Sequence, residues 1–331
     1  MAQGLYKALV AHQPGIAIDV LAPGWSAGIL GRMPEVADVL ASPFGHGQFD
    51  WAGRRRLAAE LRTRNYDRAI VLPNSWKSAL VPFLAGIPRR TGYVGEFRYG
   101  LLNDARRLDK VAMPRLVERY CALAVEPGEA PGACPAPRLR VDSQARAAAL
   151  ERLGLALDRP VLALCPGAEF GPAKRWPEAH YAAVARAKLA EGWQVWLFGS
   201  MKDKPVTDAI AALAPSPSRG EGRGEGGPLP PIHNLAGRTS LEEAVDLLAC
   251  ARCVVSNDSG LMHLAAAVEV PVIAVYGSTD PGYTPPISER AQVLRLGLPC
   301  SPCFKRECPL GHLDCLNKLE PERVLEAMAR V

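Results

Sequence analysis

Short apolar runs alternate with longer amphipathic stretches along this chain. The apolar runs that predict strands cover residues 16–21, 69–72, 161–164, 194–198, 253–255 and 272–276. The stretches with helical spacing that predict helices cover residues 54–64, 143–153, 177–191, 240–250 and 261–268. Strands that alternate with helices form a parallel sheet with helices on both faces. We therefore predict an α/β protein built from doubly wound sheets.

A stretch rich in proline, glycine and alanine at residues 126–138 interrupts this alternation, which restarts after it. A chain of 331 residues exceeds one ordinary core and suits two domains. We predict domains at residues 1–140 and 141–331, with a cleft between them. Residues 215–231 contain almost no side chains that could be buried, so they predict a disordered insert between a helix and the next strand.

Composition narrows the class of protein without identifying it. Hydrophobic residues make up 48% of the chain and charged residues 22%, as in ordinary globular proteins. No run approaches the ~20 apolar residues of a membrane span, and the first residues lack the pattern of a signal peptide. We therefore expect the nine cysteines to be thiols. The net charge of +5 suits an anionic substrate or membrane surface but decides nothing alone.

The turn from Asn257 to Gly260 carries the strongest chemical signal. It lies between a predicted strand and a predicted helix, where free backbone N–H groups and the helix dipole favour a phosphate. Gly260 permits close approach, Ser259 adds a hydroxyl, and His263 follows one turn later. The alternative is an ordinary helix N-cap, because Asp258 and Ser259 are residues that caps prefer.

A second turn, at residues 165–177, also connects a predicted strand to a predicted helix. It carries Lys174 and Arg175 at the helix start, where two cations oppose the helix dipole unless an anion binds there. Because the carboxyl ends of parallel strands meet at one edge of a sheet, the further strand ends predict a nucleotide cleft. These ends carry Ser200, Leu235, Thr279 and Asp280.

Several motifs together resemble one family, the bacterial ADP-heptose:lipopolysaccharide heptosyltransferases, and heptosyltransferase II in particular. They are residues 72–79, 86–93, 98–104, 166–177, 256–263 and 277–281. The resemblance implies a GT-B fold of two Rossmann-like domains, the first binding the acceptor and the second ADP-heptose. It also implies inverting, metal-independent transfer of L-glycero-D-manno-heptose to the heptosyl inner core of lipopolysaccharide.

The resemblance also implies roles for individual residues. Lys174 and Asp258 would serve catalysis by stabilising the departing diphosphate. The expected donor-binding residues are Lys174, Ser200, Leu235, Asp258, Ser259, Gly260, His263, Thr279 and Asp280. The expected acceptor-binding residues are Asn74, Lys77, Arg90 and Arg98, of which the three cations could equally be ordinary surface charges.

The start of the chain departs from the family pattern. Family members open with a buried strand and a Gly-Asp turn whose aspartate is the expected general base, whereas Met1 falls in the helix after that turn. We expect the base upstream of Met1 and a natural protein longer by about one strand and turn. Two alternatives stay open: an inactive nucleotide-sugar-binding paralogue, and a GT-B enzyme for another nucleotide sugar.

Four cysteines gather near the end of the chain, at Cys300, Cys303, Cys308 and Cys315, with His312 among them. Thiolates at such spacing can surround one zinc ion, and an iron–sulfur cluster is conceivable. The later gaps differ from the paired pattern of common zinc ribbons, so free thiols or a disulfide stay open. The resemblance implies that the transfer itself needs no cofactor.

The expected partners follow from the resemblance. They are ADP-heptose and the lipopolysaccharide inner core, with no nucleic acid. Because the acceptor is anchored in lipid, we expect a cytoplasmic monomer, peripheral to the inner membrane.

Overall fold

The computed structural model describes residues 1–45, 49–214 and 231–331 and divides into two compact units. Unit 1 covers Met1–Pro135 and unit 2 covers Ala136–Val331, so the division falls inside the predicted linker at residues 126–138. The predicted insert at residues 215–231 lies, except for its last residue, outside the described residues.

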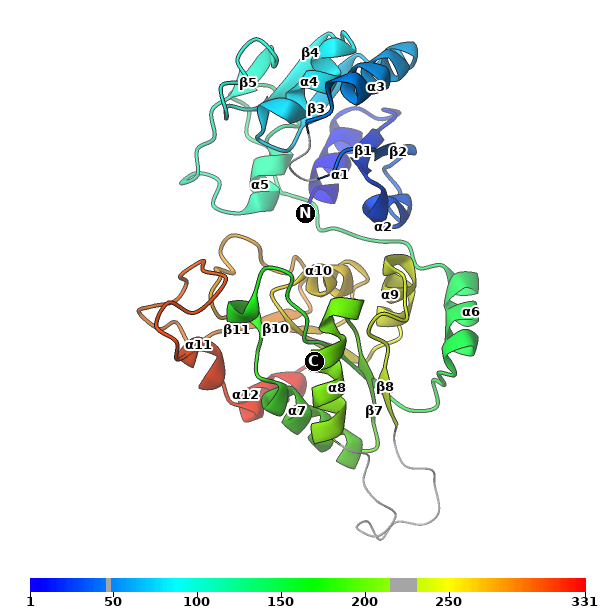
Figure 1. Ribbon diagram of the computed structural model, residues 1–331, viewed down its shortest axis with the longest axis vertical. Coiled ribbons are helices and arrows are strands. Elements are labelled where there is room, and N and C mark those ends of the chain that lie inside the picture. The colour runs from blue at the N-terminus through cyan, green and yellow to red at the C-terminus, as the bar shows by residue number, and fades with distance from the viewer. Residues whose placement is uncertain (46–48, 215–230) are drawn as a thin grey trace. The chain divides into compact units, whose positions relative to one another are not determined.

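Unit 2 is built on a six-stranded parallel sheet with the order β11-β10-β9-β6-β7-β8 (Figure 1). This is the strand order of a Rossmann fold. The strands are β6 (Val161–Cys165), β7 (Gln194–Leu197), β8 (Ile232–Asn234), β9 (Cys253–Asn257), β10 (Val272–Val275) and β11 (Ala291–Leu294).

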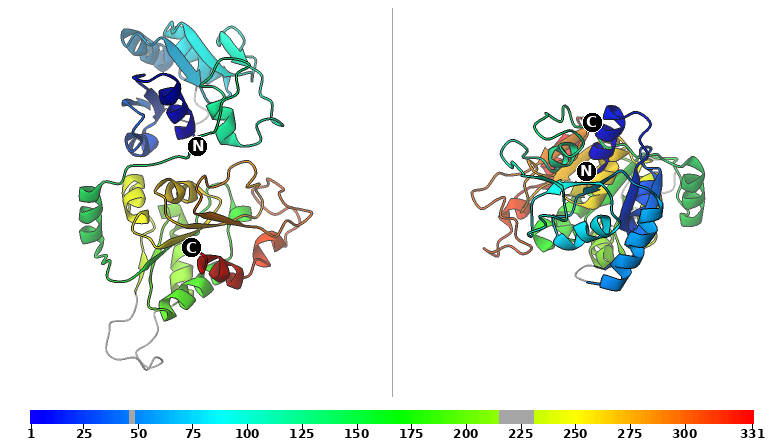
Figure 2. Two further views of the ribbon diagram at one scale, coloured as in Figure 1. Left: turned by 180° about the vertical axis from the view of Figure 1, so that it is seen from behind. Right: turned by 90° about the horizontal axis from the view of Figure 1, so that it is seen from above.

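Helices cover both faces of this sheet (Figures 1 and 2). One face packs against α7 (Glu178–Ala190), α8 (Lys204–Leu213) and α12 (Pro321–Met328). The other packs against α6 (Ser143–Leu153), α9 (Leu241–Leu248) and α10 (Gly260–Ala267). Three short helices, η2 (Pro172–Lys174), η3 (Met201–Asp203) and α11 (Asp314–Asn317), complete the unit. The predicted doubly wound architecture is therefore confirmed.

The strand order changes direction between β6 and β9. These two strands are neighbours in the sheet, but the chain leaves β6 towards β7 and β8, and leaves β9 towards β10 and β11. In such sheets, ligands bind beyond the carboxyl ends of the strands at this position. The turns that follow Cys165 and Asn257 therefore lie where a nucleotide is expected.

Unit 1 contains two separate parallel sheets, β1-β2 and β3-β4-β5. Leu5 and Leu9 of the first helix share a core with Val20 of β1 and Ile70 near the end of β3, so this helix packs against both sheets. Within the described residues, no backbone pairing joins β1 to β3. The strands are β1 (Asp19–Pro23), β2 (Asp38–Ser42), β3 (Arg68–Val71), β4 (Arg89–Tyr93) and β5 (Asp104–Arg106). The helices are α1 (Gln3–His12), η1 (Gly24–Ser26), α2 (Ala27–Gly31), α3 (Trp51–Thr63), α4 (Trp76–Leu84) and α5 (Leu116–Cys121).

Some strands differ from the prediction. β1 begins at Asp19 rather than at Ile16, because a turn with a hydrogen bond from Ile16 N to Gln13 O (3.2 Å) comes first. The apolar pattern misses β2, β4, β5, β8 and β11, several of which are short or carry polar side chains and depend on pairing with a neighbouring strand. In the described part of the chain, no helix is both long and apolar enough to cross a membrane.

Candidate active site

Three of the predicted donor-binding residues meet at one carboxylate in unit 2. Lys174 Nζ lies 2.6 Å from Asp258 Oδ2, and Thr279 Oγ1 donates to the same oxygen at 2.7 Å. The side chains of Lys174 and Asp258 are only 15% and 6% exposed. Because an ammonium carries three N–H groups, Lys174 keeps donors for a ligand after binding Asp258. The turns after β6, β9 and β10 thus form one polar cluster.

The turn before α10 does not behave as an ordinary N-cap. Ser259 occupies the N-cap position, but its side chain makes no cap hydrogen bond and instead lies 3.2 Å from Ser256 Oγ. Asp258 is engaged by Lys174 and Thr279. A Cβ added at Gly260 would meet no atom within 4 Å, so open space borders the helix start. Neither Asp258 nor Ser259 caps the helix through a side-chain hydrogen bond, so the alternative of an ordinary side-chain cap is wrong, and the turn suits an anionic ligand.

Asn257 anchors this edge of the sheet, although the motif analysis gives it no separate role. Its side chain is fully buried, and its Oδ1 accepts from Trp176 N and Tyr181 Oη, both at 3.0 Å. Its Nδ2 donates to Pro166 O at 2.6 Å. Burial raises the pKa of Tyr181 well above its ordinary value, so the hydroxyl keeps its proton. Asn257 therefore fixes the turn after β6 against the end of β9.

Three other predicted donor-binding residues, Ser200, Asp280 and His263, are not part of the Lys174 cluster. Ser200 is exposed, and its hydroxyl donates to Asp203 Oδ2 at 2.7 Å. Asp280 accepts from Gly282 N at 2.8 Å within a surface turn. His263 lies half-buried in the first turn of α10. Within the described part of the chain, no side-chain hydrogen bond joins any of these three to Lys174, Asp258 or Thr279, so their roles towards the donor stay predictions.

Leu235 does not present its side chain to a ligand. It is fully buried in the core between the sheet and α9, because the strand end turns it inward. Its backbone N–H donates to Leu197 O at 2.9 Å, and its carbonyl accepts from Arg238 N at 3.0 Å. The buried side chain of Leu235 therefore supports the sheet, and its predicted role in donor binding stays a prediction.

In unit 1, Arg98 is an internal support rather than a surface charge. It is 1% exposed, and its guanidinium donates to Tyr93 O (2.9 Å), Pro73 O (2.5 Å) and Asn74 Oδ1 (3.1 Å). Burial also lowers the pKa of Arg98. These bonds tie the loop after β3 to the end of β4, so the predicted contact of Arg98 with an acceptor is corrected.

Arg90 is also used within the protein. Its guanidinium donates to Leu101 O (2.7 Å) and Ile87 O (2.5 Å). Asn74 is exposed, and Lys77 at the start of α4 is half-buried with its Nζ 5.9 Å from the ring of Phe49. Asn74 and Lys77 therefore retain surface positions that suit their predicted role, whereas the guanidinium of Arg90 supports the loops around it.

We expect Arg98→Met to destabilise the protein by about 3 kcal/mol, because buried carbonyl groups lose their donor. Urea unfolding measures this change, with the exposed Arg56→Met on α3 as a control that stays within about 0.5 kcal/mol. Unchanged stability together with a raised KM for the acceptor would instead restore the acceptor-binding role.

Comparisons with known proteins agree on one family. The sequence model described as glycosyltransferase family 9 (heptosyltransferase) matches residues 54–314. The chain is 46% identical to lipopolysaccharide heptosyltransferase 2 of Salmonella typhimurium, over 99% of this chain and 93% of that protein. It is 47% identical to lipooligosaccharide heptosyltransferase 2 of Haemophilus influenzae, over 89% of this chain and 84% of that protein.

The fold comparison points the same way. The structure of Escherichia coli ADP-heptose lps heptosyltransferase II superposes with a TM-score of 0.85 at 44% identity, covering 99% of this chain and 93% of that one. The Escherichia coli heptosyltransferase WaaC with ADP superposes with a TM-score of 0.67 at 22% identity, which shows the shared fold. On these matches the chain belongs to glycosyltransferase family 9, the heptosyltransferase family.

Proposed function

We propose that this protein transfers L-glycero-D-manno-heptose from ADP-heptose to the heptosyl inner core of lipopolysaccharide. The near full-length similarity to proteins named lipopolysaccharide heptosyltransferase 2 supports the reaction. The observation that carries the proposal is the Lys174 ammonium, held by Asp258 at the strand-order switch beside the open start of α10. That arrangement suits a diphosphate whose negative charge grows as the sugar departs.

The proposed reaction is a single displacement with inversion. An acceptor hydroxyl oxygen forms a bond to the anomeric carbon while the bond from that carbon to the β-phosphate oxygen breaks, and ADP leaves with the electron pair. The hydroxyl proton passes to a general base. Lys174 and the N–H groups at the start of α10 stabilise the charge on ADP.

Asp258 is better suited to position Lys174 than to act as the base. Its Oδ2 already accepts from Lys174 and Thr279, so taking up a proton would disrupt both interactions. We therefore propose Lys174 as the group that contacts the diphosphate and Asp258 as a positioning residue. Ser259 and Gly260 complete the anion site on the helix side.

We also propose that the protein works as a cytoplasmic monomer at the inner membrane, with no nucleic-acid partner and no cofactor for transfer. Unit 1 exposes the aromatic side chains of Phe49, Trp51 and Trp76, and Lys77 Nζ lies 5.9 Å from the ring of Phe49. The ring of Phe49 lies 6.3 Å from that of Trp51 and 5.2 Å from that of Trp76. Exposed tryptophans together with a nearby lysine suit the interface of an anionic membrane.

A transfer assay with ADP-heptose and a heptosyl inner-core acceptor tests the proposal, followed by mass spectrometry of the product. Thermal unfolding with ADP, UDP or GDP tests the donor site separately, since only a ligand of the native state raises stability. We expect ADP to raise the unfolding temperature more than UDP or GDP does. For the membrane proposal, we expect the protein to co-sediment with phosphatidylglycerol vesicles. ADP binding without transfer favours the nucleotide-sugar-binding paralogue, and stronger stabilisation by UDP or GDP favours another sugar donor.

A further inference from the structure

Residues 295–313 connect β11 to α11 without a helix or strand of their own. Connections beyond about 12–15 residues without such structure are uncommon in compact domains. This segment, the cysteine loop, also exposes Phe304 (52%) and Leu310 (61%), so these large apolar side chains contribute little to a core. The cysteine loop therefore has neither regular secondary structure nor burial of these two side chains to hold it in place.

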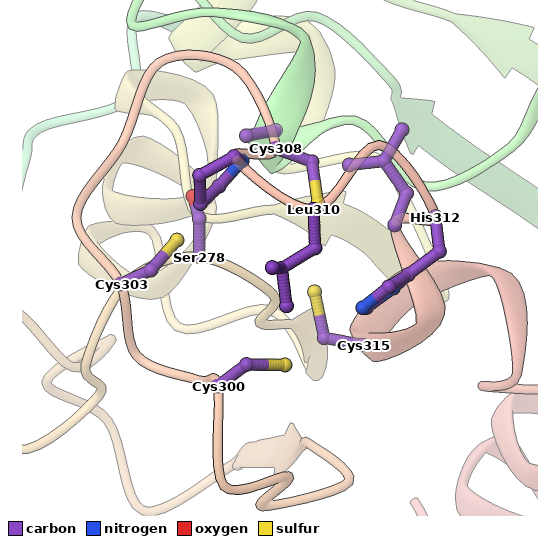
Figure 3. A pocket seen from close by; sticks show the side chains of 10 residues that line it. Ser278, Cys300, Cys303, Cys308, Leu310, His312 and Cys315 are labelled. Atoms are coloured by element: carbon purple, nitrogen blue, oxygen red, sulfur yellow. The ribbon is translucent and has the colours of Figure 1, made fainter.

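The cysteine loop and α11 place four cysteines around one cavity. Cys300, Cys303, Cys308 and Cys315 line it together with Ser278 and Ala173 (Figure 3). Figure 3 shows the sulfur atoms of Cys300, Cys303 and Cys315 turned towards the enclosed space. The cavity holds about 20 Å³ of room for water-sized occupants, which suits one water molecule or one metal ion. All four cysteines are free thiols and half-buried.

A further observation marks this cavity as a site. Ser278, which lines the cavity and is 1% exposed, has a buried hydroxyl without a hydrogen-bond partner among the described residues. A buried polar atom of this kind indicates a missing ion or water.

We propose that Cys300, Cys303, Cys308 and Cys315 bind one structural zinc ion as four thiolates. Zinc prefers tetrahedral sulfur ligands, and each thiol releases its proton to solvent on binding. The sulfur atoms must move together, because no group of three or more described Cys, His, Asp or Glu side chains stands ready to hold a metal. His312 is the weaker candidate, since its Nδ1 already accepts from Asp314 N at 2.9 Å.

The proposed zinc site would hold the cysteine loop against the residues next to Lys174 and Thr279. Phe304 N donates to Ser278 O at 2.7 Å, and Ser278 precedes Thr279 of the Lys174 cluster. Ala173 N donates to Arg306 O at 3.0 Å, next to Lys174. Gly171 has a φ of +150°, and a Cβ there would lie 2.5 Å from Arg306 O, so only glycine allows this approach. Zinc would thus position Lys174 and Thr279 without contacting the substrate.

Metal analysis of the full chain, purified without chelators or a histidine tag, tests the proposal. We expect about one zinc per chain, and less than about a fifth of that in Cys308→Ser and Cys315→Ser. Cys250→Ser, at a half-buried cysteine after α9, is the matched control and keeps its zinc. Cobalt(II) added to the metal-free chain should give the thiolate-to-cobalt absorption of a tetrahedral site, which both cluster variants lose.

A second measurement needs no variant and therefore tests the proposal even if the cysteine variants fail to fold. Alkylation of the native wild-type chain, read by peptide mass spectrometry, should show these four thiols protected until a chelator is added. Wild-type protein with negligible zinc, disulfides within the four, or stoichiometric iron instead of zinc would each overturn the proposal. The metal content does not depend on the transfer activity, so failure of the proposed function leaves this test intact.

Discussion

Replacing Lys174 by methionine lowers kcat/KM for heptose transfer by about 100- to 1000-fold, the loss typical when one donor to a developing oxyanion is removed. Methionine keeps the apolar stem of lysine as far as the ε position, so the change removes the ammonium while the turn after β6 keeps its packing. The same variant weakens ADP binding by about tenfold or more, because a hydrogen bond to a charged group contributes about 1.5–3 kcal/mol. Isothermal titration with ADP measures that second effect without any acceptor.

The control for this prediction is Lys204→Met. Lys204 lies on α8, where it pairs with Asp208 at 2.7 Å and both side chains are about half exposed. We expect it to leave transfer and ADP binding unchanged. We expect the losses of transfer activity and ADP affinity in Asp258→Asn to lie between those of Lys204→Met and Lys174→Met. This substitution removes the ion pair that holds Lys174 but leaves the ammonium in place. Unchanged ADP affinity in Lys174→Met would refute the assignment of the diphosphate site.

Asn257→Leu has the largest expected effect on stability, a loss of about 3–5 kcal/mol. The substitution leaves Trp176 N, Tyr181 Oη and Pro166 O buried without their partner. For a unit of this size, such a loss lowers Tm by roughly 10 °C. Thermal unfolding monitored by tryptophan fluorescence measures it, since Trp176 and Trp196 are buried in unit 2.

Tyr181→Phe is a milder variant to compare with Asn257→Leu. It removes only one of the three hydrogen bonds, so we expect a loss of about 1 kcal/mol. Weaker ADP binding should accompany Asn257→Leu, because the turn after β6 also carries Lys174. Equal stability of Asn257→Leu and the wild-type chain would show that the buried network is dispensable.

The sequence predicts unit 2 better than unit 1 for a physical reason. In unit 2 the central strands are buried on both faces, so β6, β7 and β10 appear as continuous apolar runs, and the helix predicted at residues 143–153 coincides with α6. In unit 1, β4 reads Arg-Arg-Thr-Gly-Tyr and β5 reads Asp-Ala-Arg. Such strands depend on their neighbours, which no local pattern reveals.

The sequence also predicts only part of the candidate site. Strand-end turns bring Lys174, Asp258 and Thr279 together as predicted, because parallel strands align their carboxyl ends at one edge. Burial of a polar side chain, by contrast, depends on distant partners. Arg98 and Asn257 lie in motifs as polar residues, yet both are buried. Arg98 donates to Pro73 O and Asn257 donates to Pro166 O, both far along the chain.

The divided sheet of unit 1 has a practical consequence for anyone who handles the protein. Among the described residues, β1 and β3 each pair with a strand on one side only, so each presents a row of peptide groups that another extended segment could pair with. In concentrated or partly unfolded samples, we therefore expect these edge strands to pair between molecules and cause aggregation. The refolding yield should fall as the protein concentration rises. A lysine placed on the outer edge of β3 would be the first choice for keeping such preparations monodisperse.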